Sequence, residues 1–417
     1  MIKFQQILFC AVLSLSFAHA QTSRAVLYSS LGAELTQYDV DAGSAALVKK
    51  GLVRLPANVQ YAWQHPSRKY FYVAWSDGGA AAAAPGAATV PKGSLHGVTA
   101  FAIDPQSGAL RQIGQPASLP ARPIHLSVDM SGAHVLVAYN IPSSITVHRL
   151  NADGTLGAQV SQPSPLDTGI YAHQIRVEPS GKDVIMVTRG NVATKTKAED
   201  RGGVKLYSYA GGVLKNRASI APNGGVNFQP RHLDFDPSQR WIYLSLEAQS
   251  KLQVYPLGKD GGLAANPAFT KDSLANPAQK SLRQNAGTLH VHPSGRFVYQ
   301  ANRSAVADAS GRHVLGGGEN TIAVYAINQQ TGEPALIQNV DTRGAEPRTF
   351  ALDPSARMLV VGNQTAVFDG SGPNAKSIPS SLAVFRAGTD GKLEYVRKYD
   401  VSSGKESLFW MGIVPLP

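Results

Sequence analysis

Short runs of alternating apolar and polar residues recur seven times along the chain. The first run of each repeat has the composition of a β-strand, in AVLYSSL from Ala25, YFYVAW from Tyr70, AHVLVAYN from Ala133, KDVIMVTRG from Lys182, RWIYLSLE from Arg240, RFVYQANR from Arg296 and RMLVVGNQ from Arg357. A second run follows each copy and carries an aromatic residue or histidine at a fixed place, in LTQYDV, VTAFAI, ITVHRL, VKLYSY, LQVYPL, IAVYAI and LAVFRA. A glycine-containing turn and a weaker strand complete each repeat.

Another strand, ending in a turn, precedes six of the seven first runs. These segments are YAWQHPSRK, HLSVDMSGA, QIRVEPSGK, HLDFDPSQR, LHVHPSGR and FALDPSAR. Proline starts the turn in five of them and Met130 in the sixth, followed by serine and often glycine. The repeat therefore has four strands. The segment SLFWMGIVP, from Ser407 to Pro415, matches the leading strand that the first repeat lacks, so the two chain ends are expected to pair in one blade.

Seven repeats of four antiparallel strands predict an all-β fold, a seven-bladed β-propeller, because radial repetition leaves only short sheet edges. Residues 21–417 form a single domain in this interpretation, at about 57 residues per blade. Two long segments interrupt the pattern, Ser76 to Gly97 and Gly190 to Gly203. The strand pattern resumes in register behind each, so both are predicted to be excursions from a blade.

The first twenty residues have the features of a secretory signal peptide. Lys3 precedes an apolar run from Ile7 to Phe17, and Ala18-His19-Ala20 is a small-x-small cleavage site. The run is short of the roughly 20 residues that a membrane-spanning helix needs. Cleavage after Ala20 would place the protein in the periplasm or outside the cell. It would also remove Cys10, the only cysteine, so no disulfide, thiolate nucleophile or cysteine-ligated metal is expected.

The chain carries 39 basic and 28 acidic residues, a formal net charge of +11. Nucleic acid, a membrane surface or an acidic small molecule could account for such an excess. Export and the lack of a basic cluster interleaved with aromatic residues disfavour nucleic acid. The expected partner is a small anionic or lactone substrate, with no nucleic acid and no membrane span. The sequence does not determine the oligomeric state, although a monomer is favoured.

Repeat arithmetic brings six polar residues to one end of the blades. Six residues before the turn proline lie His173, Arg231 and Arg348, and ten residues after it lie Arg189, Glu247 and Arg303. The two positions are predicted to be cross-strand neighbours on the innermost strands, which line the central channel. Arg231 and Glu247 are therefore expected to be partners at one shared mouth. Crowded arginines repel one another, which favours an anion bound among them.

Such a group of residues can hydrolyse an ester without a metal or a cofactor, and neither is expected. His or Glu can remove a proton from water, and arginine donors can stabilise the oxyanion that forms at the carbonyl. The same groups could also form or open a lactone from an unsaturated diacid. Taken singly, each residue also has a structural explanation, such as a buried histidine or a cross-strand ion pair.

The segments HPSGRFVYQANR, AEPRTFALDP and IAVYAI resemble the seven-bladed lactonase family of the bacterial 6-phosphogluconolactonase and fungal carboxy-cis,cis-muconate cyclase type. The resemblance covers about Ala25 to Pro415. It implies that the catalytic residues are His173 in YAHQIRVEP, Arg231 in QPRHLDFDP, Glu247 at the end of WIYLSLE, and Arg303 in QANRS. One departure is TRGN, from Thr188 to Asn191, where many members carry an Asp-Leu-Gly type stretch.

The sequence thus predicts an exported lactone hydrolase for a sugar or carboxylic-acid lactone. His173 or Glu247 would be the acid or base, and Arg231 and Arg303 would hold the carboxylate and oxyanion. Arg348, Arg189, Gln174 and His232 are predicted to bind substrate. Two alternatives stay open: a muconate-type cycloisomerase, and a non-catalytic propeller that binds an anionic ligand or an envelope protein.

Overall fold

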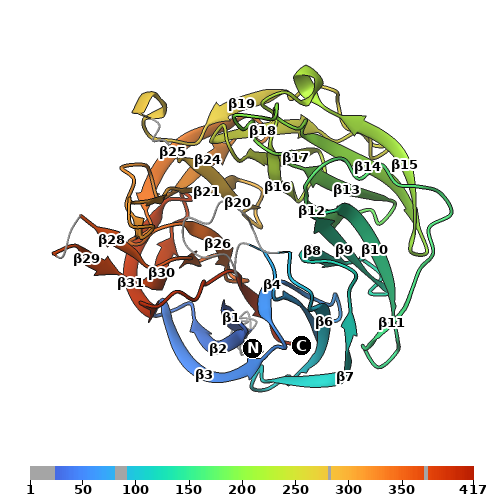
Figure 1. The fold of residues 1–417 in the computed structure, drawn as a ribbon, viewed down its shortest axis with the longest axis horizontal. Coiled ribbons are helices and arrows are strands. Elements are labelled where there is room, and N and C mark those ends of the chain that lie inside the picture. Colours follow the sequence, from blue (N-terminus) through green and yellow to red (C-terminus); the bar gives the residue numbers. More distant parts are fainter. Residues whose placement is uncertain (1–23, 80–91, 280–282, 371–373) are drawn as a thin grey trace, which may run out of the picture.

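Seven four-stranded antiparallel blades surround a central channel in the computed structural model of the protein (Figure 1). The structure describes residues 24–79, 92–279, 283–370 and 374–417. The predicted signal peptide, including Cys10, and residues 80–91 of the first excursion lie outside the described residues. The predicted all-β, seven-bladed propeller is confirmed.

Blades 1 to 4 follow one another around the ring in chain order. From the channel outward their strands are β32 (Met411–Pro415), β1 (Ala25–Leu31), β2 (Glu34–Asp41) and β3 (Ala46–Arg54) in blade 1; β4 (Asn58–Gln64), β5 (Tyr70–Ser76), β6 (His96–Ile103) and β7 (Leu110–Ser118) in blade 2; β8 (Pro123–Val128), β9 (His134–Asn140), β10 (Ser143–Leu150) and β11 (Leu156–Gln159) in blade 3; and β12 (Ala172–Val177), β13 (Asp183–Thr188), β14 (Gly203–Ala210) and β15 (Val213–Ile220) in blade 4.

Blades 5 to 7 complete the ring and have the same strand order. Their strands are β16 (Pro230–Phe235), β17 (Trp241–Leu246), β18 (Lys251–Pro256) and β19 (Phe269–Asp272) in blade 5; β20 (Asn285–Val291), β21 (Phe297–Arg303), β24 (Thr321–Ile327) and β25 (Pro334–Asp341) in blade 6; and β26 (Pro347–Leu352), β27 (Met358–Asn363), β30 (Ser380–Ala387) and β31 (Leu393–Ser402) in blade 7. Two short 3-10 helices, Pro222–Gly225 and Pro277–Gln279, lie in connections.

The ring closes in blade 1, where the first and last described strands meet. Strand β32 pairs antiparallel with β1, with Val26 opposite Val414 and Tyr28 opposite Gly412. The predicted closure by the C-terminal segment is therefore confirmed. Among the described residues, no helix is long and apolar enough to cross a membrane.

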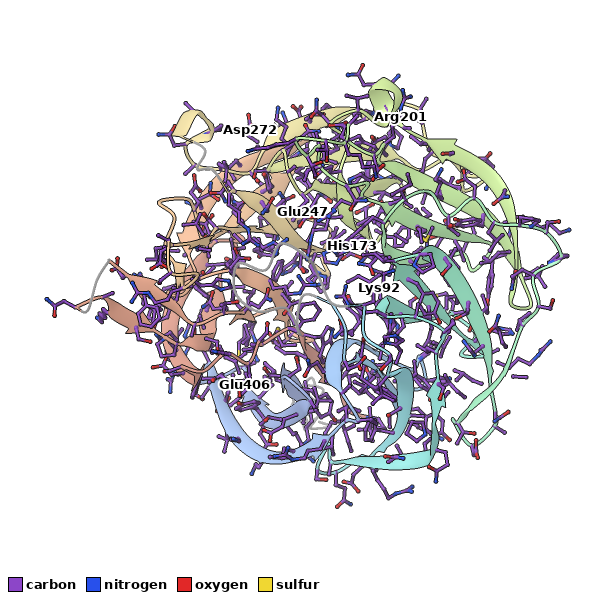
Figure 2. The ribbon with its side chains drawn as sticks, viewed as in Figure 1. Lys92, His173, Arg201, Glu247, Asp272 and Glu406 are labelled. Carbon is purple, nitrogen blue, oxygen red and sulfur yellow. The ribbon has the colours of Figure 1, made fainter. Side chains whose placement is uncertain are left out.

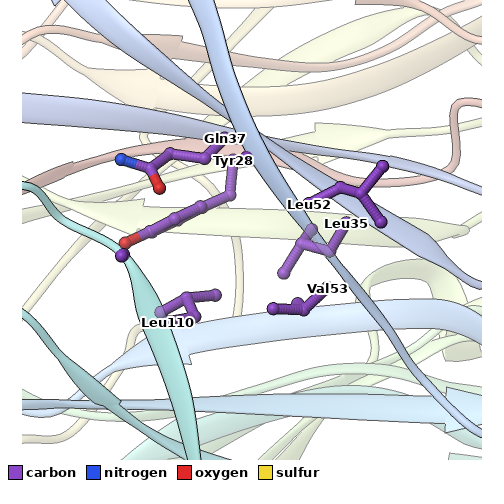
Figure 3. A pocket seen from close by; sticks show the side chains of 8 residues that line it. Tyr28, Leu35, Gln37, Leu52, Val53 and Leu110 are labelled. Carbon is purple, nitrogen blue, oxygen red and sulfur yellow. The ribbon is translucent and has the colours of Figure 1, made fainter.

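A buried tyrosine on the second strand of a blade ties that blade to the next one. Its hydroxyl donates to a glycine carbonyl in the turn between the two outer strands of the neighbour, in the pairs Tyr28–Gly108, Tyr72–Gly154, Tyr243–Gly332 and Tyr299–Gly391. Burial raises the pKa of these phenols, so they stay neutral donors. Figure 3 shows Tyr28 between Gln37 and Leu110, beside a cavity of about 80 Å³ on the flank of blades 1 and 2.

An accessory four-stranded sheet lies outside the seven blades. The sequence pattern did not predict this sheet. Its strands are β22 (Val306–Ala307), β23 (His313–Val314), β28 (Val367–Asp369) and β29 (Lys376–Ile378). They come from excursions of blades 6 and 7, joined by a parallel bridge between Val314 and Phe368. Strands of two or three residues are too short to produce a detectable alternation in the sequence.

The expected cross-strand register is wrong, because a β-bulge interrupts the innermost pair of strands in blades 2 to 7. In blade 4, Ala172 pairs with Thr188 and Gln174 with Val187, which leaves His173 as the extra residue. Arg231 and Arg348 occupy the same place in blades 5 and 7. Bulges are common next to active sites, where they re-aim a side chain. Arg231 and Glu247 are therefore not backbone partners. The Glu247 backbone N–H donates to the Gln229 carbonyl oxygen instead.

Candidate functional site

The bulges and the strand ends beyond them gather five arginines at one end of the channel, here called the arginine mouth. Its guanidinium groups belong to Arg122, Arg189, Arg231, Arg303 and Arg348, which come from blades 3 to 7. Figure 2 shows His173 and Glu247 toward the middle of the ring and Arg201 and Asp272 nearer its periphery. The predicted convergence of polar residues at one mouth is therefore found.

The Glu247 carboxylate, at the end of β17, is the centre of this cluster. Its Oε2 lies 2.9 Å from Arg189 Nη1, and its Oε1 lies 3.4 Å from Arg231 Nε and also contacts Arg303 Nη2. Burial alone would raise the pKa of Glu247, but the three arginines outweigh it and hold that pKa far below its usual value. Glu247 is thus ionised at neutral pH, where it orders three cations and is a weak proton acceptor.

A second carboxylate, Glu346, lies in the cluster and was not among the residues that the repeat pattern predicted. It precedes β26, and its Oε2 lies 3.4 Å from Arg303 Nη1, so Arg303 lies between two carboxylates. Glu346 adopts a left-handed backbone conformation, with φ of 53°. Such strain in a residue other than glycine is uncommon and clusters at functional sites. Tyr171 has φ of 60° and lies under the Arg189 guanidinium, 4.1 Å from it.

Arg348 differs from the three clamped arginines because it has no carboxylate partner among the described residues. Its guanidinium lies 3.7 Å above the Phe409 ring, and its Nε donates to the Phe409 carbonyl oxygen at 3.2 Å. Burial, together with Arg231 and Arg303, lowers the pKa of Arg348 well below its usual value. An anion bound here would relieve this unfavourable environment.

Arg122 was also missed, and it adds a second cation without a carboxylate in the described part of the chain. Its Nε donates to Gln60 Oε1 at 2.8 Å, and its side chain is buried. Burial lowers the pKa of Arg122. Five arginines therefore face two carboxylates, Glu247 and Glu346, which leaves an excess of three positive charges at the mouth. Such a site favours an anionic ligand.

His173 is a neutral base next to these cations. Burial, and then the nearby Arg231, lower its pKa well below the usual value, so it is uncharged at neutral pH. Its Nδ1 is buried and has no hydrogen-bond partner among the described residues. The His173 ring lies edge-on to His232, with 5.1 Å between ring centroids. Arg231 Nη1 lies 2.9 Å from His232 Nδ1, which must accept this bond because a guanidinium can only donate.

Gln174, predicted to bind substrate, links two blades. Its Oε1 accepts a 2.6 Å hydrogen bond from the Leu233 backbone N–H of blade 5. A Gln174→Met variant leaves that buried N–H unpaired and is expected to lose about 1–3 kcal/mol of unfolding free energy. Activity per folded molecule should stay near the wild-type level. Thermal melts measure the loss of stability, with the exposed Gln330→Met as control. An unchanged melting temperature together with a large rise in KM would instead place Gln174 at the substrate.

Loss of the Arg348 charge should weaken substrate binding without lowering the stability of the protein. An Arg348→Met variant keeps contact with Phe409 but removes the unpaired cation, so KM for an anionic lactone should rise about tenfold or more. The melting temperature should stay equal or increase, because repulsion from Arg231 and Arg303 is lost. Steady-state kinetics and thermal melts, with the exposed Arg357→Met as control, test both effects. A lower melting temperature with unchanged KM would make Arg348 purely structural.

No group of three or more His, Cys, Asp or Glu side chains in the described ranges could hold a metal ion.

A family model described as a seven-bladed β-propeller lactonase matches residues 25–367. The chain belongs to this lactonase family. The resemblance inferred from the sequence is thereby confirmed.

Relatives within the lactonase family carry related names. The chain is 30% identical to a 6-phosphogluconolactonase of Bacillus subtilis over 274 residues, which are 64% of this chain and 70% of the relative. It is 24% identical to a 6-phosphogluconolactonase of Formosa agariphila over 327 residues, 75% of this chain and 81% of the other. The periplasmic gluconolactonase PpgL of Pseudomonas aeruginosa superimposes with a TM-score of 0.68 at 22% identity, over 95% of this chain and all of that one.

Proposed function

We propose that this protein hydrolyses a sugar or carboxylic-acid lactone at the arginine mouth. The observation that carries the proposal is His173, a neutral histidine beside an excess of positive charge, whose buried Nδ1 has no hydrogen-bond partner among the described residues. The names of the lactonase relatives support the reaction class. Of the two acid-base candidates, the environment favours His173, because a carboxylate clamped by three arginines accepts a proton poorly.

The reaction follows from these placements. His173 takes a proton from water while the water oxygen bonds to the lactone carbonyl carbon, and the carbonyl π electrons move to its oxygen. Arginine N–H groups of Arg231 and Arg303 stabilise that oxyanion, and the unpaired Arg348 binds a negative group of the substrate. The carbonyl then re-forms, the ring C–O bond breaks, and the leaving oxygen takes the proton from His173. The product is an open-chain hydroxy acid.

Export of the protein is part of the proposal. The signal-like segment 1–20 supports it, as does the periplasmic location in the name of PpgL. A substrate in the periplasm would reach the arginine mouth without crossing the inner membrane.

A panel of lactones, assayed by the acid that ring opening releases, tests the proposal. Glucono-1,5-lactone, its 6-phosphate and muconolactone should include at least one substrate opened faster than in buffer. Ultraviolet absorbance should show no diene, because hydrolysis forms none. Diene formation from muconolactone without net uptake of water would favour the cycloisomerase, and buffer-level rates on the whole panel would contradict the proposal.

The pH profile of kcat/KM should report the His173 environment. A lowered pKa keeps the imidazole neutral to lower pH, so the rate should stay level on acidification past about 6.5, the ordinary histidine value. It should decrease only below that. Initial rates corrected for spontaneous opening measure this, and an acid limb centred above 6.5 would contradict the assignment.

A further inference from the structure

The other end of the channel, where the innermost strands reach their turns, holds a cavity of about 390 Å³. We call this end the turn mouth. Blades 1 to 4 line it, through residues that include Trp63, Ser127, Met130, Arg176, Ile413 and Val414. Arg68 lines the rim as well and is exposed, and none of the lining residues is acidic. The cavity therefore combines apolar walls with cations.

Arg176 is fixed over an aromatic platform and keeps donors available. Its guanidinium carbon lies 4.9 Å from the Trp63 ring centroid and 5.5 Å from that of Phe235. Its only ion pair in the described part of the chain is a long one, 3.4 Å from Nη1 to Asp234 Oδ1. A guanidinium has five N–H donors, so several of them can serve a ligand.

Ser127 provides a second and independent sign of a ligand. It lines the cavity and is only 1% exposed, yet its Oγ has no hydrogen-bond partner among the described residues. Buried hydroxyls are nearly always hydrogen-bonded, so an unpaired one requires an explanation. A polar atom held in the cavity would pair with it.

Met130 is the residue that replaces the turn proline of the other repeats. It lines the same cavity and is 56% exposed, so its side chain is open to a ligand. Methionine adapts its shape and makes favourable contacts with aromatic rings. The departure from the repeat therefore adds an apolar surface at the place where a ligand would enter.

Aromatic rings separate this cavity from the arginine mouth. The Tyr61 and His125 rings contact each other at a tilt, with 4.0 Å between ring centroids and 39° between ring planes, and the Trp63 ring lies 5.8 Å from His125. His125 is fully buried. A ligand in the turn mouth would therefore not compete directly with a substrate at His173.

We propose that the turn mouth binds a small aromatic carboxylate. Its ring lies against Trp63 and Met130, its carboxylate accepts from the Arg176 guanidinium, and Ser127 donates to it. This site does not depend on the lactone hydrolysis proposed above, because it uses none of the same residues.

Sodium benzoate is the probe, with benzyl alcohol as its uncharged counterpart, in ligand-observed NMR titrations of the purified protein. Benzoate should bind saturably and at least about tenfold more tightly than benzyl alcohol. Arg176→Met should weaken benzoate by a similar factor. Arg296→Met, which removes an arginine stacked on Phe297 in another turn, is the matched control and should bind as wild type does.

Two further variants keep the outcome decisive. Met130→Glu changes an exposed residue, so it should fold even if Arg176→Met does not, and its negative charge should weaken benzoate several-fold. Arg348→Met should leave benzoate binding at the turn mouth unchanged. The proposal is overturned if benzoate shows no saturable binding, if it binds no better than benzyl alcohol, or if Arg348→Met abolishes binding while Met130→Glu does not.

Discussion

His173→Ala should reduce kcat/KM for ring opening by about 10²-fold or more while the protein keeps its fold. Loss of the imidazole removes the proton acceptor for water and leaves the arginine cluster around Glu247 in place. The affected quantity should be mainly kcat, because the histidine acts on the reacting water more than on the bound lactone. Initial rates of acid release, corrected for spontaneous opening, measure the effect.

His292→Ala is the matched control for this variant. His292 lies at the turn end of blade 6, and its Nδ1 lies 2.8 Å from Ser294 Oγ, away from the arginine mouth. It should retain the wild-type rate. If His173→Ala also retains that rate with an unchanged melting temperature, His173 is a packed channel histidine and the acid-base assignment is wrong.

Glu247→Gln should cause the largest loss of stability. The neutral amide leaves the buried Arg231 and Arg303 and the partly buried Arg189 with Glu346 as the only carboxylate ion-paired to any of them in the described part of the chain. Removing one partner of a buried ion pair costs about 3–5 kcal/mol, because the remaining charges are uncompensated. Denaturant unfolding at neutral pH gives the difference, and the exposed Glu394→Gln should show almost none.

The pH dependence of this loss has a definite sign. The folded-state pKa of Glu247 is depressed, so its stabilisation is fully present above the unfolded value of about 4.3 and is lost as the pH falls through the folded value. The difference in unfolding free energy between wild type and Glu247→Gln should stay constant between pH 7 and 5 and become smaller in stronger acid. Equal unfolding free energies of wild type and Glu247→Gln at pH 7 would contradict this prediction, because they would show that the arginines do not need the Glu247 charge.

The propeller could be predicted because each blade repeats a strong local pattern. Strands β13 and β17 are mostly apolar runs that follow a turn proline, and this order recurs in the other blades, so the strand order could be inferred from the sequence. The closing strand β32 was identifiable because it matches the strand missing from the first repeat. The accessory sheet could not be predicted, since its strands pair through distant excursions and have no repeat to compare with.

The arginine mouth was predicted in part, and its omissions have a common origin. Arg122, Tyr171 and Glu346 each lie eight residues before the turn position of their blade, two residues before the bulge position. Extending the repeat arithmetic by one alternation would have added all three to the candidates. The bulge itself could not be predicted, because one extra residue in a strand changes the pairing without changing the pattern of turns.

The choice between His173 and Glu247 as the acid-base group depends more on their charge than on their position. Both lie near the middle of the ring, but the histidine is neutral and has a ring nitrogen without a hydrogen-bond partner among the described residues, whereas the glutamate is ionised. The repeat pattern placed both residues and the predicted arginines at one mouth, but it could not show that three of the arginines contact Glu247.

The central claim is that the arginine mouth opens a lactone with water, and its most direct test is the initial rate of acid release by wild type and by the double variant His173→Ala/Arg303→Ala. The account predicts that wild type exceeds the buffer rate on at least one lactone of the panel and that the double variant falls to about 1% of wild type or less. A double variant that folds and opens the same lactone at the wild-type rate would contradict it.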